Sequence, residues 1–83
     1  MGVRKDAATI AFGRALQELR AEKGLTQESL AHEADTERSH ISALERAEKG
    51  PSLTTIFRLA DALAIPAAEL IGRVQEKLDK KKR

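Results

Sequence analysis

The sequence predicts an all-α fold, and three observations lead to this prediction. Ala, Leu, Glu, Lys and Arg, which are good helix formers, are abundant among the 83 residues. Aromatic residues make up 2% of the chain and β-branched residues are few, so little remains to build a sheet. Apolar residues recur every three or four positions in several segments that Gly or Pro separates. We therefore expect a bundle of short helices.

Size and composition exclude several classes of protein. With 83 residues the chain is expected to form one small domain with a single modest core. It contains no cysteine, which excludes disulfide bonds and thiolate metal sites. No apolar run approaches the roughly 20 residues of a membrane helix, and no signal peptide is recognisable. We expect a soluble, cytoplasmic protein.

The first helix is expected to span residues 7–23. Phe12, Leu16 and Leu19 repeat at helical spacing on one face, while polar side chains occupy the other faces. Gly24 follows, and we expect it to end the helix as a left-handed cap residue.

The segment from Thr26 to Arg46 predicts two short helices joined by a tight turn. Thr26 is a favourable N-cap for the first of them. Residues 35–37 favour a turn, because Asp and Thr side chains compete for their own backbone. Ile41 and Leu44 then share a small core with the first of these helices and leave a polar face exposed. This arrangement is typical of a helix-turn-helix.

Two further helices are expected after Pro51. Ser52 is the expected N-cap of the first, and Pro66 breaks its apolar pattern. Its core stripe comprises Ile56, Leu59, Ala60 and Leu63. The second is expected over residues 67–78, with apolar positions at Leu70, Ile71, Val74 and Leu78.

Three apolar side chains exceed what the core of a monomer needs, namely Phe57, Ile71 and Val74. We expect them to form a symmetric dimer interface. The simpler alternative is that they cap the core.

The two ends of the chain are expected to lie outside the bundle of residues 7–78. Residues 1–6 form a flexible leader, which is either a solvated tail or an arm that touches DNA phosphates or a minor groove. Residues 79–83 form a basic tail that is disordered by composition and attracts phosphates nonspecifically.

Charge alone gives weak support for a nucleic-acid partner. The formal net charge is +2, but four of the 15 basic residues lie at 80–83, so the remaining 11 are outnumbered by 13 acidic ones. A basic patch is the usual electrostatic footprint of a nucleic-acid binder. A DNA-binding prediction must therefore depend on a motif.

Three short motifs, in this order and spacing, resemble the Xre-type helix-turn-helix family of phage repressors, Cro-like proteins and restriction-modification controllers. They are Gly-Leu-Thr-Gln-Glu at 24–28, Ile-Ser-x-Leu-Glu-Arg at 41–46 and Pro-Ser-Leu at 51–53. The resemblance extends over residues 12–65. It implies a lambda-repressor-like bundle of five short helices and a recognition helix at about 37–47 in the DNA major groove. It also implies a homodimeric transcriptional regulator, of repressor or controller type, on a palindromic or pseudopalindromic operator of double-stranded DNA.

Positions that match the family's motifs carry expected roles in DNA binding. The expected base-reading residues are Glu37, Arg38, Ser39, Ser42 and Ala43. The expected phosphate-binding residues are Gln27, His40, Arg46, Lys49, Ser52 and Thr54. Arg38 is the best candidate reader, because its guanidinium can donate two hydrogen bonds to guanine O6 and N7. The alternatives are that these are solvated surface side chains, that Gln27 caps its own helix and that Glu37 only favours the helix start.

The resemblance also implies a structural ion pair between Arg20 and Glu45, which would remove the glutamate from the DNA groove. The sequence departs from the family's pattern at Asp35 and Ala47, where glycine is common. We expect Asp35 to tolerate a left-handed backbone. We expect the recognition helix to run on past Ala47 to Gly50.

No catalytic or cofactor site is expected. The chain has no nucleophile beside a base and no phosphate-binding glycine loop, and His32 and His40 lack partners at metal-ligand spacing. We therefore expect neither an enzyme nor a metal protein. The alternative to a DNA-binding regulator is a protein-interaction module, or an antitoxin-like partner-binding protein, that uses the same bundle.

Overall fold

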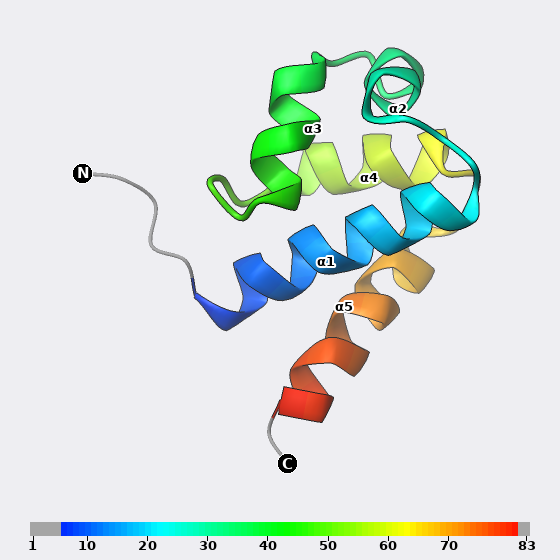
Figure 1. The fold of residues 1–83 in the computed structure, drawn as a ribbon. Helices are drawn as coiled ribbons and strands as arrows, with labels where there is room; N and C mark the ends of the chain where they lie inside the picture. Colours follow the sequence, from blue (N-terminus) through cyan, green and yellow to red (C-terminus); the bar gives the residue numbers. More distant parts are fainter. Residues whose placement is uncertain (1–5, 82–83) are drawn as a thin grey trace.

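The computed structural model describes residues 6–81, which form five α-helices and no β-strand (Figure 1). The helices are α1 (Ala7–Glu22), α2 (Gln27–Glu33), α3 (Arg38–Glu45), α4 (Leu53–Ala62) and α5 (Ala67–Lys81). The prediction of an all-α bundle of five helices is confirmed. No helix in this part of the chain has the length and hydrophobicity needed to cross a membrane.

Side-chain oxygens cap the beginnings of α1, α2 and α4. Thr26 and Ser52 each accept a hydrogen bond from the backbone N–H three residues later, at 3.0 and 3.1 Å, as predicted. Asp6 does the same for α1 at 2.8 Å. Asp6 is therefore a helix cap and not part of a flexible leader; residues 1–5 of the expected leader lie outside the described residues.

The first four helices end in the same way, with a left-handed residue just past the helix. These residues are Gly24, Asp35, Ala47 and Ala64, with φ of 70°, 57°, 61° and 59°. In each case the next backbone N–H donates to a carbonyl in the last helical turn, over 2.8 to 3.0 Å. The left-handed conformation expected for Gly24 and Asp35 is confirmed.

α3 is shorter than the recognition helix that the sequence predicted. It ends at Glu45 and does not run on to Gly50, because Ala47 adopts the left-handed conformation that glycine favours. Ala47 is 5% exposed, so burial of its methyl group offsets part of the conformational cost. At the other end Glu37 is the N-cap residue, although its side chain makes no capping hydrogen bond.

The last helix is longer than predicted. α5 continues to Lys81, so the expectation of disorder from Asp79 onward is wrong for residues 79–81. Residues 82–83 of the expected basic tail lie outside the described residues.

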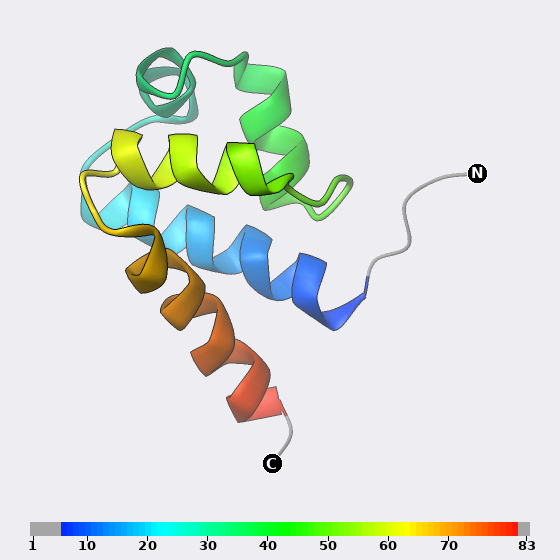
Figure 2. The same ribbon diagram turned by 180° about the vertical axis from the view of Figure 1, so that it is seen from behind.

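α1 is the central element of the bundle. It packs against α3 on one side and α5 on the other, while α2 and α4 complete the layer that contains α3 (Figures 1 and 2). The fully buried large side chains are Leu16, Leu19, Leu30, Ile41, Leu44, Leu59, Leu63 and Leu70. Val74 is 8% exposed and belongs to this core, so the expectation that it is surplus to the monomer is wrong.

Gly13 sets the distance between α1 and α3. A Cβ atom at this position would lie 2.6 Å from the backbone oxygen of Leu44 and 2.7 Å from that of Glu45. Both oxygens belong to backbone at the end of α3, which cannot swing aside as a side chain can. Glycine is therefore required for the end of α3 to lie directly on α1.

Four charged side chains join α1 to α5. Arg73 donates to Glu22 at 2.7 and 3.1 Å and to Glu18 at 3.4 Å, while Lys77 donates to Glu18. These bonds from Lys77 and Arg73 lower the pKa of the Glu18 and Glu22 carboxyls, and the Glu22 carboxylate raises the pKa of Arg73. We call these four residues the α1–α5 clamp.

We expect Gly13→Ala to destabilise the protein by about 2 kcal/mol, because overpacking outweighs the better helix propensity of alanine. Chemical denaturation would measure the loss. Gly72→Ala is the matched control: Gly72 also lies within a helix, but a Cβ atom added there would meet nothing within 4 Å. That control should be neutral or stabilise by up to about 1 kcal/mol. Equal effects of the two substitutions would contradict the close α1–α3 contact.

Acid should weaken the clamp. The pKa of both carboxyls is lower in the folded than in the unfolded chain. Their contribution is therefore fully present above the unfolded value of about 4.3 and is lost as the pH falls from there through the lower folded values. The free energy of unfolding of the wild type should exceed that of a Glu18→Gln, Glu22→Gln variant at pH 7. The difference should shrink as the pH falls through the lowered pKa values of the two carboxyls. A difference that stays constant with pH would argue against the clamp.

Candidate nucleic-acid interface

α2 and α3 form the helix-turn-helix. Ile41 and Leu44 of α3 are fully buried and pack on the apolar side of α2, which leaves the opposite face of α3 open to solvent. The connection contains the left-handed Asp35, whose N–H returns to His32 O at 3.2 Å. This short connection fixes the second helix across the first, as the sequence predicted.

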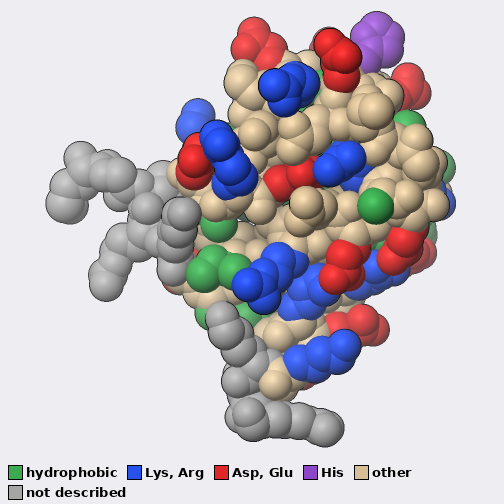
Figure 3. Space-filling model, viewed as in Figure 1, with side chains coloured by type: hydrophobic (Ala, Val, Ile, Leu, Met, Phe, Trp, Pro, Cys, Tyr) green, Lys and Arg blue, Asp and Glu red, His purple; other side chains and the backbone are tan. Residues whose placement is uncertain are grey.

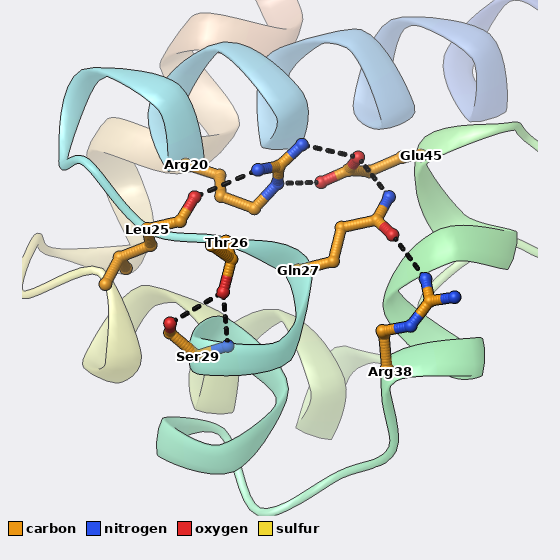
Figure 4. A network of polar contacts seen from close by, with 7 residues as sticks. All are labelled: Arg20, Leu25, Thr26, Gln27, Ser29, Arg38 and Glu45. Carbon is orange, nitrogen blue, oxygen red and sulfur yellow. Dashed lines mark hydrogen bonds and ion pairs between the residues drawn. The ribbon is translucent and has the colours of Figure 1, made fainter.

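The ion pair between Arg20 and Glu45 links α1 to the end of α3 (Figure 4). Arg20 Nε donates to Glu45 Oε2 at 2.6 Å and Nη2 donates to Oε1 at 3.2 Å, while Nη1 donates to the carbonyl of Leu25 at 2.9 Å. The side chains of Arg20 and Glu45 are 17% and 3% exposed. The Glu45 carboxylate raises the pKa of Arg20. Glu45 is thereby neutralised and turned away from the exposed face of α3.

Gln27 extends this pair to the first residue of α3. Its Nε2 donates to Glu45 Oε1 at 2.9 Å, and its Oε1 accepts from Arg38 Nη1 at 3.0 Å (Figure 4). A carboxylate paired with arginine can only accept, so the amide nitrogen of Gln27 must face Glu45 and its oxygen must face Arg38. The buried ion pair therefore sets the orientation of Gln27, which in turn holds Arg38.

The expected base-reading residues lie along α3 or at its start. Glu37, Arg38 and Ser39 are exposed, and Ser42 and Ala43 are half-buried. They share the side of α3 that does not pack on the core, so the structure brings all five of them to one face.

The expected phosphate-binding residues are more dispersed. Gln27 and His40 are half-buried at the flanks of α3, and Arg46 and Lys49 are exposed beyond its end. Arg46 forms an exposed ion pair with Glu48 at 3.1 Å.

Ser52 and Thr54 lie at the start of α4 and are both exposed. The Ser52 hydroxyl is already engaged, because it accepts from the N–H of Thr55 at 3.1 Å and donates to Thr55 Oγ1 at 2.9 Å. The Ser52 hydroxyl is therefore less available to bind a phosphate than the sequence suggested. The Thr54 hydroxyl makes no hydrogen bond within the described residues.

The face of the molecule in Figure 3 carries both signs of charge. Lys and Arg side chains alternate with Asp and Glu side chains over α3 and α1, and they do not form a continuous basic field. Long-range attraction to a polyanion is correspondingly weak, as the composition indicated.

A separate group of apolar side chains is exposed on α4 and α5. Leu53 is 70% exposed, Phe57 56% and Ile71 42%. Phe57 and Ile71 were expected from the sequence, but Leu53 was missed. The i, i+4 spacing of Leu53 and Phe57 was the available signal, since it puts both on the same side of α4.

Residues 6–81 contain no group of three or more His, Cys, Asp or Glu side chains that could hold a metal ion. The polar side chains gathered at the helix-turn-helix instead offer hydrogen-bond donors to an external partner.

The helix-turn-helix family model HTH_3 matches residues 16–70. An HTH-type transcriptional regulator from Sinorhizobium fredii is 38% identical over 58 residues, which cover 70% of this chain and 75% of that one. The control protein C.MunI from a Mycoplasma species is 34% identical over 81% of this chain and 92% of its own length. The immunity repressor of Bacillus phage phi105 is 37% identical, and the match spans 42% of its length.

Solved structures of transcriptional regulators are also similar to this chain. The restriction-modification controller protein C.AhdI from Aeromonas hydrophila is 43% identical, with a TM-score of 0.76 over 78% of this chain and 98% of that chain. The clp gene regulator ClgR from Corynebacterium glutamicum is 25% identical, with a TM-score of 0.86 over 95% of this chain and 84% of that chain.

Removing the buried carboxylate should be costly. Glu45→Ala leaves the Arg20 guanidinium without its partner and removes the acceptor of Gln27, so we expect a loss of about 3 kcal/mol in the free energy of unfolding. Thermal and urea denaturation would measure it. Glu48→Ala, which breaks the exposed pair with Arg46, is the matched control and should cost under about 1 kcal/mol. Similar losses for both variants would refute a special role for the buried pair.

Proposed function

Because the chain belongs to the helix-turn-helix family of DNA-binding transcriptional regulators, which are not enzymes, we propose that it acts as a homodimer that reads a specific operator with α3. The single observation that carries this proposal is Arg38, an exposed guanidinium at the start of α3 that Gln27 and Glu45 hold in position. In this role the protein is a repressor or controller that works on double-stranded DNA in the cytoplasm.

Arg38 is suited to reading guanine. Its bond to Gln27 uses one of the five N–H donors of the guanidinium, which leaves enough donors for a bidentate contact to guanine O6 and N7. A side chain that is already held loses less conformational freedom on binding. The neighbouring Ser39, Ser42 and Ala43 would contribute shorter contacts along the same groove.

Gln27 would serve a second purpose at the DNA backbone. Its Nε2 carries two N–H bonds, and the bond to Glu45 uses one of them. The other can donate to a phosphate at the edge of the groove. His40, Arg46, Lys49 and Thr54 would supply further phosphate contacts, with a smaller part for Ser52.

The exposed apolar residues on α4 and α5 support a homodimer. Phe57 and Ile71 are large side chains that the monomer leaves in water, which is unfavourable unless a second surface covers them. Leu53 extends the same group, and Val74 contributes only through the core. A twofold axis through this surface would present two copies of α3 to half-sites about 34–36 Å apart on a palindromic operator.

A second function remains compatible with the bundle. The acidic residues around α2, including Glu28, Glu33 and Asp35, would repel a nonspecific polyanion, which favours a protein partner over DNA. In that case the same exposed face of α3 would contact a protein, as in an antitoxin-like module.

Arg38→Ala should abolish preference for one base in each half-site. We expect a loss of roughly 1–3 kcal/mol in discrimination, measured by selection of bound oligonucleotides followed by titration of matched and mismatched sites. Because Arg38 is exposed, the melting temperature should change little. Arg58→Ala, an exposed arginine on α4, is the control and should leave the selected sequence unchanged. Undiminished discrimination by the Arg38 variant would eliminate it as the reading residue.

Salt dependence separates DNA binding from protein binding. Binding to the selected duplex should weaken steeply between about 50 and 200 mM salt, because phosphate contacts release counterions. A protein-interaction module would bind neither random nor selected duplexes at either concentration. That outcome would favour the second function.

Phe57→Glu and Ile71→Glu should convert the dimer to a monomer. A charge in the apolar interface must be desolvated on association, so we expect at least about a hundredfold weaker self-association. Sedimentation equilibrium would detect the change, and circular dichroism should report an unchanged helix content. Gln17→Glu, on the exposed side of α1, is the charge-matched control. A wild type that remains monomeric at micromolar concentration would contradict the dimer.

A further inference from the structure

A groove separates the first turns of α1 from the last turns of α5. The two helices diverge in this direction, away from the α1–α5 clamp (Figures 1 and 2). The groove has a volume of about 330 Å³, which lies at the lower end of the range of small-molecule sites. Nothing in the proposed DNA-binding function uses it.

The floor of the groove is apolar and its edges are cationic. Ile10, Ala11 and Leu78 line the floor. Ala11 is buried, while Ile10 and Leu78 are only partly covered by the rest of the chain. An apolar ligand placed here would remove further surface of these two side chains from water.

Arg14 stands at one edge, on α1, and Lys80 at the other, on α5. Neither side chain forms an ion pair within the described residues. The acidic residue of the lining is Glu18, and its carboxylate is occupied by Lys77 and Arg73. The groove therefore combines an apolar floor with unpaired positive charge on opposite edges.

We propose that this groove binds a small anionic amphiphile, namely a carboxylate attached to an aliphatic chain. The aliphatic part would lie along Ile10 and Leu78, and the carboxylate would lie between the guanidinium of Arg14 and the ammonium of Lys80. Charge-assisted hydrogen bonds to these two groups would orient the ligand. This site is distinct from the DNA-binding face and does not depend on the proposed function.

The chain's own terminal segments fit the groove less well. Residues 1–5 and 82–83 adjoin its two sides in the sequence, but they contain no Asp or Glu and carry Arg4, Lys5, Lys82 and Arg83. Positive side chains do not complement positive edges. Charge complementarity therefore favours an external anion.

Octanoate is a suitable probe of this site. Titration of the full ¹⁵N-labelled chain should shift the amide resonances of Ile10, Ala11 and Leu78 in a saturable manner. Octylammonium and octanol, which have the same chain length, should bind at least about fivefold more weakly. An Arg14→Gln, Lys80→Gln variant should weaken octanoate binding at least about fivefold and leave the melting temperature almost unchanged. Arg58→Gln, a control on α4, should bind as the wild type does.

Several results would overturn the proposal. Equal binding of the anionic, neutral and cationic probes would mean that the edges contribute nothing. Shifts centred on Phe57 and Ile71 would mean that the probe binds the exposed apolar residues instead. A chain that ignores octanoate but binds an acidic helical peptide at the same amides would have a protein partner in this groove.

Discussion

The arrangement of α1, α2 and α3 depends on the carboxylate of Glu45. It is almost completely buried at the end of α3, and it accepts hydrogen bonds from Arg20 on α1 and Gln27 on α2. A buried charge of this kind is tolerated only with full pairing, so the three helices must meet at one relative position. The same carboxylate dictates which end of the Gln27 amide faces Arg38. The pairing that Glu45 needs inside the bundle therefore also determines how Arg38 is held at the surface.

α1 connects α3 to α5. Gly13 allows the backbone at the end of α3 to lie directly on α1. The clamp of Glu18, Glu22, Arg73 and Lys77 then fastens α5 on the opposite side. α1 therefore fixes the position of α3 relative to α5, and with it the position of the exposed apolar residue Ile71 relative to α3.

Much of the fold could be predicted from the sequence, because it depends on local signals. Helical periodicity, the N-caps Thr26 and Ser52 and the glycine at 24 all act within a few residues. Two of the errors arose where distant packing overrides local preference. Burial of Ala47 offsets part of the cost of a left-handed conformation that alanine normally avoids. Packing of α5 into the bundle buries Val74, which looked surplus from the pattern of α5 alone.

The residues of the candidate site could be named from the sequence, but the hydrogen bonds that join them could not. Pattern and resemblance identified Arg20, Gln27, Arg38 and Glu45 singly or in pairs. The continuous path from Arg20 to Arg38 required three-dimensional geometry, because its members lie on three helices. Gly13 was missed for the same reason, because its role depends on a contact with α3. Leu53 was missed although its i, i+4 spacing with Phe57 is a local signal. An isolated glycine inside a helical pattern was the only available hint of the α1–α3 contact.

The left-handed alanines have a consequence for engineering this scaffold. Ala64 is exposed, so burial offsets less of the roughly 1–2 kcal/mol that the left-handed conformation costs an L-residue than it does at Ala47. Glycine at position 64 would recover part of that cost without changing α2 or α3, whereas glycine at position 47 would open a small void. The junction between α4 and α5 is therefore where a more heat-resistant version of this protein can be obtained most directly.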